Sequence, residues 1–485
     1  QGWMILILGW VFVPFYTRSM VYTMPEFLER RYNPQSRTIL SVISLVSYVL
    51  TKVAVTVYAG GLVFQQVFGI KELWGIDFFW IAAIGLVVLT ALYTIFGGMK
   101  SVLYTSVLQT PILLLGSLII LVLGFKELGG WDEMMRVCGA VTVNDYGDTM
   151  TNLIRSNDDA NFPWLGALIG SAIIGFWYWC TDQFIVQRVL SGKNEMEARR
   201  GTIFGAYLKL LPVFLFLIPG MIAFALHQKY IGAGGEGFLP MLANGTANAD
   251  AAFPTLVAKL LPAGVKGLVV CGILAALMSS LASLFNSSAM LFTIDFYKRF
   301  RPETPEKKLV GIGQVATVVI VILGILWIPI MRSVGDVLYT YLQDVQSVLA
   351  PGIAAAFLLG ICWKRTSAQG GMWGLIAGMV IGLTRLGAKV YYSNAGEVAD
   401  STFKYLFYDM NWLFFCGWMF LFCIIVVIVV SLATKAPTAE KIQGLVFGTA
   451  TKEQKAATRA SWNHWDIIHT VIILAITGAF YWYFW

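Results

Sequence analysis

A cluster of hydroxyl and amide side chains interrupts the apolar segment at residues 265–294. The stretch reads LMSSLASLFNSS, and its polar members are Ser279, Ser280, Ser283, Asn286, Ser287 and Ser288. On a helix, the Ala276 carbonyl and the hydroxyls of Ser279 and Ser280 can converge on one point. Three neutral oxygens suit a hard monovalent cation. The alternative is that these are small residues for close helix packing, bonded to their own backbone, and the pattern alone favours it.

A run of aromatic residues is followed by polar ones in GFWYWCTDQFIVQR, which runs from Gly175 to Arg188. Asp182 is a functional candidate because an ionisable side chain is costly inside an apolar segment. An ion pair with a basic residue such as Arg188 is an equally good explanation. The aromatic side chains can stack on the C–H face of a sugar ring, or they can form a belt at a membrane surface. The glycines of the preceding GALIGSAIIG predict a loosened, unwound helix.

Two further apolar segments carry isolated polar residues. Lys209 in AYLKLLP lies roughly 10 Å from the end of its helix, where it either extends its amine to the surface or donates to a buried polar ligand. In YTYLQDVQSVLAPGIA, a proline and several polar residues predict a kinked helix that lines a cavity; they are Gln343, Asp344, Gln346 and Pro351. A single glutamine there usually makes a packing hydrogen bond, but four such anomalies on four segments favour function.

The elements that must position these residues are membrane helices. The 485 residues are 58% hydrophobic and 13% charged, and many apolar runs match the hydrocarbon thickness of a bilayer. Lipid offers the backbone no hydrogen-bond partners, so the runs must be helical. We predict an all-α polytopic membrane protein with about twelve transmembrane helices, at about 3–22, 38–66, 77–97, 103–125, 162–188, 202–227, 263–296, 308–331, 337–363, 369–392, 405–433 and 466–485.

The net charge of +7 is explained by membrane topology. With the first helix starting outside, the inner segments carry about twice as many lysines and arginines as the outer ones. We therefore predict the lipid bilayer and no nucleic acid as a partner, and the plasma membrane as the location of this multi-pass protein. The chain has no Walker A motif and no facing catalytic pair or metal cluster, so we expect no enzyme. The outer loop 228–262 carries a glycosylation sequon at Asn244.

Seven motifs together resemble the solute:sodium symporter family, and closely its sodium/glucose cotransporter branch, over about residues 8–433. They are GWVFVPFY, YTMPEFLERRY, YWCTDQFIVQR, YLKLLP, LMSSLASLFNSS, FTIDFY and AAAFLLGICWKR. The resemblance implies the leucine-transporter fold, with two inverted repeats and binding sites near the membrane midplane. It implies sodium-coupled symport of a sugar such as glucose or galactose by alternating access. The alternatives are a sodium-coupled symporter of myo-inositol or another polyol, and a sodium-independent membrane sugar sensor.

The same resemblance assigns the coupling ion to the serine-rich helix. The family's sodium ligands fall on the carbonyl of Ala276 and the hydroxyls of Ser279 and Ser280, which favours function over packing for these residues. One position departs from the family pattern. The aspartate usual in YTDxLQ is Ser106 in YTSVLQ. Because sugar cotransporters that use a second sodium carry a carboxylate there, a second cation site is not expected.

The resemblance also assigns the sugar contacts. Hydrogen bonds to the sugar are implied for Lys209 and Gln343. An aromatic closes the inner side over the sugar at Tyr178, with Trp179 beside it, and Tyr339 is an aromatic of the outer gate. The family's polar contact three residues before the gate tyrosine is Gly175 here, which leaves the identity of the sugar open.

The resemblance further implies that the chain starts two helices late in the family's order. The broken helix that supplies the other sodium-binding carbonyls, and the sugar-binding glutamate, would precede Gln1. We therefore expect residues 1–433 to form an incomplete transport bundle. Residues 434–465 are expected to form a cytoplasmic linker, and residues 466–485 a C-terminal transmembrane helix.

Overall fold

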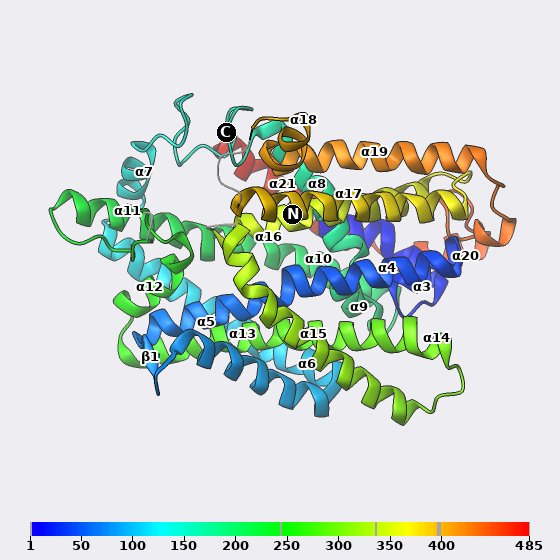
Figure 1. Ribbon diagram of the computed structural model, residues 1–485, viewed down its shortest axis with the longest axis horizontal. Coiled ribbons are helices and arrows are strands. Elements are labelled where there is room, and N and C mark those ends of the chain that lie inside the picture. The colour runs from blue at the N-terminus through cyan, green and yellow to red at the C-terminus, as the bar shows by residue number, and fades with distance from the viewer. Residues whose placement is uncertain (1, 243–244, 335–336, 395–398, 485) are drawn as a thin grey trace.

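The computed structural model describes residues 2–242, 245–334, 337–394 and 399–484. The regular structure of these residues is helical, apart from one short antiparallel hairpin of β1 (Glu72–Leu73) and β2 (Ile76–Asp77) and two isolated bridges. Most long helices run along the long axis of an elongated bundle (Figure 1). The all-α prediction is confirmed. The predicted sequon at Asn244 lies outside the described residues.

The first half of the chain contains several spans in which α-helix passes into a π-helical turn. Its helices are α1 (Gly2–Ile7), η1 (Leu8–Phe12), α2 (Val13–Ser19), α3 (Met24–Arg31), α4 (Pro34–Ser47), η2 (Tyr48–Val53), α5 (Ala54–Phe68), α6 (Phe78–Leu128), α7 (Trp131–Gly139), α8 (Trp164–Phe176), η3 (Trp177–Thr181), α9 (Gln183–Leu190), α10 (Glu195–Pro212), η4 (Val213–Leu217) and α11 (Ile218–Gly232). Such turns are frequent at functional positions, and η3 contains the predicted aromatic pair Tyr178 and Trp179.

The second half also combines long helices with π-helical turns and several short elements. They are η5 (Ala249–Ala251), α12 (Ala252–Leu260), α13 (Ala263–Met290), η6 (Leu291–Tyr297), α14 (Lys298–Phe300), α15 (Glu306–Val334), α16 (Leu338–Cys362), α17 (Ala368–Asn394), α18 (Thr402–Lys404), η7 (Tyr405–Asp409), α19 (Trp412–Ala433), η8 (Ala439–Lys441), α20 (Lys452–Ala460) and α21 (His464–Tyr483). The serine-rich stretch therefore lies in α13, and Gln343 lies in α16.

The number of membrane spans is close to the predicted twelve. Among the described residues, ten helices are long and apolar enough to cross a membrane. The continuous helix formed by α1, η1 and α2 makes an eleventh span together with α3, from which it is bent by 73°. The remaining predicted run, 77–97, lies on the first part of α6, where the apolar stretch Phe78–Leu92 is too short to count as a separate span. Each predicted run thus lies on a helix, because lipid permits no other backbone arrangement.

The two ends of the bundle correspond to the two sides assigned from the charges. The hairpin of β1 and β2, α7 and α12, all in segments assigned outside, lie at one end of the bundle (Figure 1). At the opposite end lie α3, α14 and α20, from segments assigned inside (Figure 1). This arrangement agrees with the positive-inside rule, because the second group comes from the basic segments.

Polar side chains fix where several helices begin. The Asn33 side chain accepts the Ser36 N–H at 2.8 Å at the start of α4, and the Asp77 side chain accepts the Phe79 N–H at 2.9 Å at the start of α6. The last helix, α21, starts with a reciprocal capping pair in which Asn463 is the N-cap. Each cap supplies a partner for a backbone donor that the helix cannot satisfy itself.

Small residues bring α16, α17 and α19 into close contact. A Cβ atom on Gly378 of α17 would lie 2.6 Å from the Gly352 Cα atom of α16, so neither position accepts a side chain without moving a helix. Gly374, one turn earlier on α17, faces Val427 of α19 in the same way. Glycines at this spacing allow helix backbones to approach in a membrane, where dispersion replaces the hydrophobic effect as the source of attraction.

A buried ion pair connects two membrane spans. The ammonium of Lys52 in η2 bonds the carboxylate of Asp182, and both side chains are buried. The other carboxylate oxygen accepts the Tyr48 hydroxyl at 2.9 Å and the Phe184 N–H at 3.2 Å. The Lys52 amine also lies 5.1 Å from the Tyr178 ring centroid and 4.4 Å from that of Phe184, so aromatic faces surround the cation.

The structure corrects two expectations from the sequence in this region. Asp182 pairs with Lys52 and not with Arg188, whose guanidinium instead bonds the Ser283 hydroxyl. The glycines of 166–175 do not unwind their helix. Gly166 and Gly170 instead pack against Leu413 of α19. The helix ends later, at Asp182, which has extended backbone angles and caps α9.

We expect Lys52→Met to lower the free energy of unfolding by about 3–5 kcal/mol, since it leaves a buried carboxylate unpaired. Adding Asp182→Asn should restore part of this loss because it removes the charge. The measurement is the thermal unfolding midpoint of the detergent-solubilised protein. Lys389→Met is the matched control, because its partner Asp344 keeps Arg385 within 3.8 Å. Equal losses in the single and double variants would contradict the role of the pair.

Candidate sodium and substrate sites

The predicted sodium ligands lie together on the half-buried part of α13. The Ser280 hydroxyl donates to the Ala276 carbonyl at 3.1 Å, so these two predicted oxygens are neighbours. The Ser279 and Ser106 hydroxyl oxygens, the second from α6, are 2.6 Å apart. Ser106, where the resemblance leads us to expect a carboxylate if a second sodium binds, therefore contacts the predicted sodium site through a neutral hydroxyl.

The later residues of the serine-rich stretch hold α13 to α9. The Gln187 amide donates to the Ser287 hydroxyl at 2.6 Å and to the Ser283 carbonyl at 3.3 Å. The Asn286 amide lies 3.4 Å from the Gln187 carbonyl oxygen. The Ser288 hydroxyl is buried with no hydrogen-bond partner among the described residues. The packing explanation thus accounts for the second half of the stretch, and the first half is left as the ion-site candidate.

The aromatic turn η3 places Tyr178 and Trp179 side by side. Their ring centroids are 5.2 Å apart at an interplanar angle of 79°. The Lys209 ammonium of α10 lies 5.3 Å from the Trp179 ring centroid. Trp179, Lys209 and Arg188 line a cavity of 460 Å³ between α1, α9 and α10. A cation, an indole and an apolar wall at one cavity provide hydrogen-bond donors beside a flat ring.

The remaining predicted contacts lie on α16, a helix buried over most of its length that packs against η3 and α8. Gln343 is half-buried, and Tyr339, one turn earlier, is exposed and within hydrogen-bonding reach of it. The start of α16 is fixed by Asp250, whose carboxylate accepts the Leu338 N–H at 3.1 Å. Burial raises the pKa of the Asp250 carboxyl, and the Leu338 donor opposes this shift.

Gly175 faces protein at close range. A Cβ atom there would lie 3.2 Å from Cγ of Met4 in α1. The position of the missing polar contact is therefore covered by an apolar side chain of the first helix. Ile5 and Leu8, which lie near Met4 in the chain, line the cavity beside Trp179. Gly175 does not line it.

The predicted residues form three groups in the structure. Ala276, Ser279 and Ser280 lie on α13; Tyr178, Trp179 and Lys209 gather around η3; and Tyr339 and Gln343 lie on α16. The cavity lining contains Trp179 and Lys209 but none of Tyr178, Tyr339 and Gln343.

Sequence reasoning missed two ion pairs beside these groups. Lys52 bonds Asp182 next to the aromatic turn. Asp344, which directly follows Gln343, bonds Lys389 and lies 3.8 Å from Arg385, both on α17. The available signal was the same for each residue, an ionisable side chain within an apolar run. Ionisable residues of opposite charge on different runs indicate that buried ion pairs exist, but not which residues pair.

Comparison with known proteins decides the family. A model of the sodium:solute symporter family matches residues 2–378. The chain belongs to this family. As a sodium:solute symporter it is a multi-pass membrane transporter and not an enzyme, and sodium is the ion that drives the solute.

Several curated relatives are similar to this symporter over most of its length. The sodium/mannose cotransporter of Bos taurus is 36% identical, with 99% of this chain and 83% of the relative covered. Sodium/glucose cotransporter 1 of Ovis aries is 37% identical over 89% of this chain and 67% of its own. Sodium/myo-inositol cotransporter 2 of Homo sapiens is 35% identical over 92% of this chain and 67% of its own.

A solved structure supports the leucine-transporter-like fold of the symporter. It is a substrate-bound outward-open state of a Na⁺-coupled sialic acid symporter, with a TM-score of 0.69 and 20% sequence identity. The match covers 90% of this chain and 83% of the other. The fold class predicted from the sequence is confirmed.

We expect Gly175→Asn to destabilise the symporter by about 1–3 kcal/mol, because the amide would be buried against Met4 without a partner. Adding Met4→Ala should recover much of the loss by opening space. The thermal unfolding midpoint measures both. Gly264→Asn on α13 is the control, since no atom lies within 4 Å of a Cβ there and the residue does not line the cavity beside Trp179. An unchanged midpoint with altered solute selectivity would mean that residue 175 reaches the substrate.

Proposed function

We propose that this protein is a sodium-coupled symporter of a sugar such as glucose or galactose, located in the plasma membrane and working by alternating access. The observation that carries the substrate class is the Lys209 ammonium over the Trp179 ring at a cavity of 460 Å³. Lysine only donates hydrogen bonds, and an aromatic face suits the C–H side of a sugar ring. The named glucose and mannose cotransporters among the relatives support the same class.

Sodium would bind at the three neutral oxygens of α13. The Ala276 carbonyl accepts the Ser280 hydroxyl at 3.1 Å. If that hydroxyl rotates away, the carbonyl and the hydroxyl can each offer a lone pair to a cation. The Ser279 hydroxyl can donate to Ser106 and still offer a lone pair to the ion. Neutral oxygens suffice for a monovalent hard cation.

The substrate would bind between elements that belong to different parts of the bundle. Lys209 on α10 and Gln343 on α16 supply hydrogen bonds, and Tyr178, Trp179 and Tyr339 cover the sugar. Trp179 and Lys209 line one cavity, and Gln343 does not line it. We therefore infer that α16 and η3 move closer together when the sugar binds, so that all three residues contact it. Closure of this kind is part of alternating access.

The energy available is sufficient for accumulation. One sodium ion moving down about 100 mV releases roughly 2.3 kcal/mol. A tenfold sodium gradient adds about 1.4 kcal/mol. Together they permit accumulation of an uncharged solute on the order of several hundredfold. We propose one sodium per cycle, because the carboxylate expected at a second site is Ser106 here.

The second candidate function is sodium-coupled transport of myo-inositol or another polyol. It is favoured by the 35% identity to a sodium/myo-inositol cotransporter, which is almost as high as that to the glucose cotransporter. A ring polyol offers hydroxyls that both donate and accept, as a hexose does, so Lys209 and Gln343 suit either ligand. A sodium-independent sugar sensor is disfavoured because Ser279 and Ser280 are both present.

We expect Ser280→Ala in the full-length gene product to raise the sodium concentration for half-maximal uptake. Loss of one ligand oxygen costs about 1 kcal/mol, which is roughly fivefold in affinity. The measurement is radiolabelled sugar uptake by cells over a series of sodium concentrations.

Ser288→Ala is the matched control for this experiment. Ser288 lies on the same helix, and its buried hydroxyl has no partner among the described residues, so its loss should leave the sodium dependence unchanged. If both variants behave like the wild type while their expression is intact, Ser280 serves packing alone.

We expect deoxy and epimeric sugars to compete for uptake, with discrimination lost at one ring position and kept elsewhere. The reason is that Gly175 offers no side chain to hydrogen-bond one of the sugar hydroxyls. A sugar that lacks a hydroxyl bonded by Gln343 or Lys209 would instead leave that side chain unpaired, which costs about 1–3 kcal/mol of binding free energy. Gln343→Ala should therefore cost more sugar affinity than Gly175→Asn. The test is competition by a deoxy-sugar series and by myo-inositol. Competition by amino acids or carboxylates but by no sugar or polyol would contradict the substrate class.

A further inference from the structure

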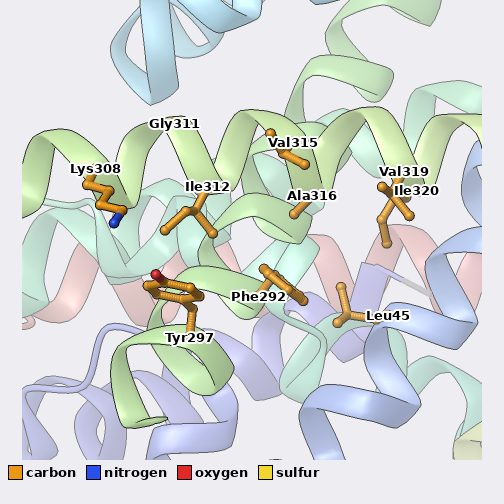
Figure 2. Close-up of a pocket in the computed structure, with 10 residues that line it drawn as sticks. All are labelled: Leu45, Phe292, Tyr297, Lys308, Gly311, Ile312, Val315, Ala316, Val319 and Ile320. Atoms are coloured by element: carbon orange, nitrogen blue, oxygen red, sulfur yellow. The ribbon is translucent and has the colours of Figure 1, made fainter. Parts of the chain in front are cut away.

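An apolar groove lies on the outside of the bundle between α15, η6 and α4. Its volume is 570 Å³, which is within the range of about 300–1,000 Å³ for ligand sites. Leu45 of α4, Phe292 of η6 and Val315 of α15 are among its lining residues (Figure 2). Val315 is 64% exposed, so in a membrane the groove opens toward lipid.

The two polar side chains of the groove lie at the same end. Figure 2 shows Lys308 and Tyr297 at one end, and Leu45, Val319 and Ile320 at the other. From Lys308 to Ile320 the helix advances about 18 Å. One leaflet contributes about 15 Å to the hydrocarbon core. The groove therefore has the polarity and the length of one lipid chain with its headgroup.

The polar end lies at the inner surface of the membrane. The segment 297–308 joins α13 and η6 to α15, and it contains five basic and two acidic residues. Arg299 in this segment is bound to the Pro34 carbonyl at 2.8 Å. The salt bridges of the described part of the chain do not include Lys308. Its ammonium at the groove entrance is thus available to an anion, and the cytoplasmic leaflet is rich in anionic lipids.

We propose that this groove binds one acyl chain of an anionic glycerophospholipid from the inner leaflet. The chain packs against Phe292, Ile312, Val315 and Val319, and the phosphate accepts hydrogen bonds from the Lys308 ammonium and the Tyr297 hydroxyl. A sugar is excluded as the occupant because the body of the groove offers no hydrogen-bond partner. An uncharged sterol fills the apolar part but leaves Lys308 unpaired.

The site has a structural link to the ion-binding helix. η6 continues α13 without a break, and α13 carries the proposed sodium ligands Ser279 and Ser280. A chain between η6 and α15 fills the space between these two elements and adds dispersion contacts to both. Lipid bound here stabilises the folded protein by mass action and holds the inner end of the sodium-binding span against α15.

The test is native mass spectrometry of the purified full-length protein with dioleoyl-phosphatidylglycerol or dioleoyl-phosphatidylcholine as the added lipid. We expect one tightly held phosphatidylglycerol, with an affinity at least threefold higher than that for phosphatidylcholine. Lys308→Gln should abolish this preference. Val315→Trp should weaken both lipids at least threefold by filling the groove.

Leu326→Trp is the matched control, since Leu326 lies on α15 outside the groove and is 64% exposed, like Val315. It should leave lipid binding unchanged. The unfolding midpoint without added lipid shows whether each variant is folded, and Lys308→Gln, near the helix end, tests the headgroup contact even if Val315→Trp misfolds. Equal affinity for the two lipids, or an equal loss in Leu326→Trp and Val315→Trp, would overturn the proposal.

Discussion

The carboxylate of Asp182 connects the candidate sites to the rest of the bundle. It bonds Lys52, accepts the Tyr48 hydroxyl and caps α9. A charge buried at membrane depth requires such partners. Because these partners lie on two different spans, Asp182 can bond all of them only when the helix breaks between η3 and α9, where it does in the structure. That break determines which way Tyr178 and Trp179 face. It also sets the direction of α9, whose Gln187 bonds α13.

The serine-rich helix serves two purposes in consecutive turns, and Ser283 lies at the boundary. Its hydroxyl accepts a hydrogen bond from Arg188 and lies 3.0 Å from the Ser279 carbonyl. One side of this residue therefore belongs to the contact with α9, and the other to the proposed sodium ligands. A change in the position of α9 can reach the ion site through the Ser283 hydroxyl. This is a physical route by which the aromatic turn and the ion can affect each other's equilibrium.

The sequence predicted whatever follows from the bilayer itself. Apolar runs had to be helices, and basic segments had to lie on one side, so the fold class and the topology agree with the structure. The partner of Asp182 could not be predicted, because Lys52 is 130 residues away and Arg188 was closer along the chain. The role of Gly166 and Gly170 could not be predicted either, because glycine permits both helix unwinding and close helix packing. The contact of both glycines with Leu413 shows that they serve packing. The contacts of Gln187 with Ser283 and Ser287 separate the packing serines from the candidate ligands. Helical periodicity could not predict these contacts.

The helices that carry the proposed sodium and sugar ligands pack against different neighbours. Glycine contacts join α16 to α17 and α17 to α19, and Asp344, next to Gln343, bonds Lys389. Arg385 donates to the Met410 carbonyl at 2.7 Å and lies 4.0 Å from the Phe415 ring centroid. Gln343 therefore belongs to one packed group of helices, and the proposed sodium ligands belong to another, in which α13 packs against α6 and α15. The ion and the sugar would therefore bind to different groups of helices, and each ligand can bind more tightly to one relative arrangement of these groups than to another. Such a difference in affinity between conformations is what coupling of ion and solute transport requires.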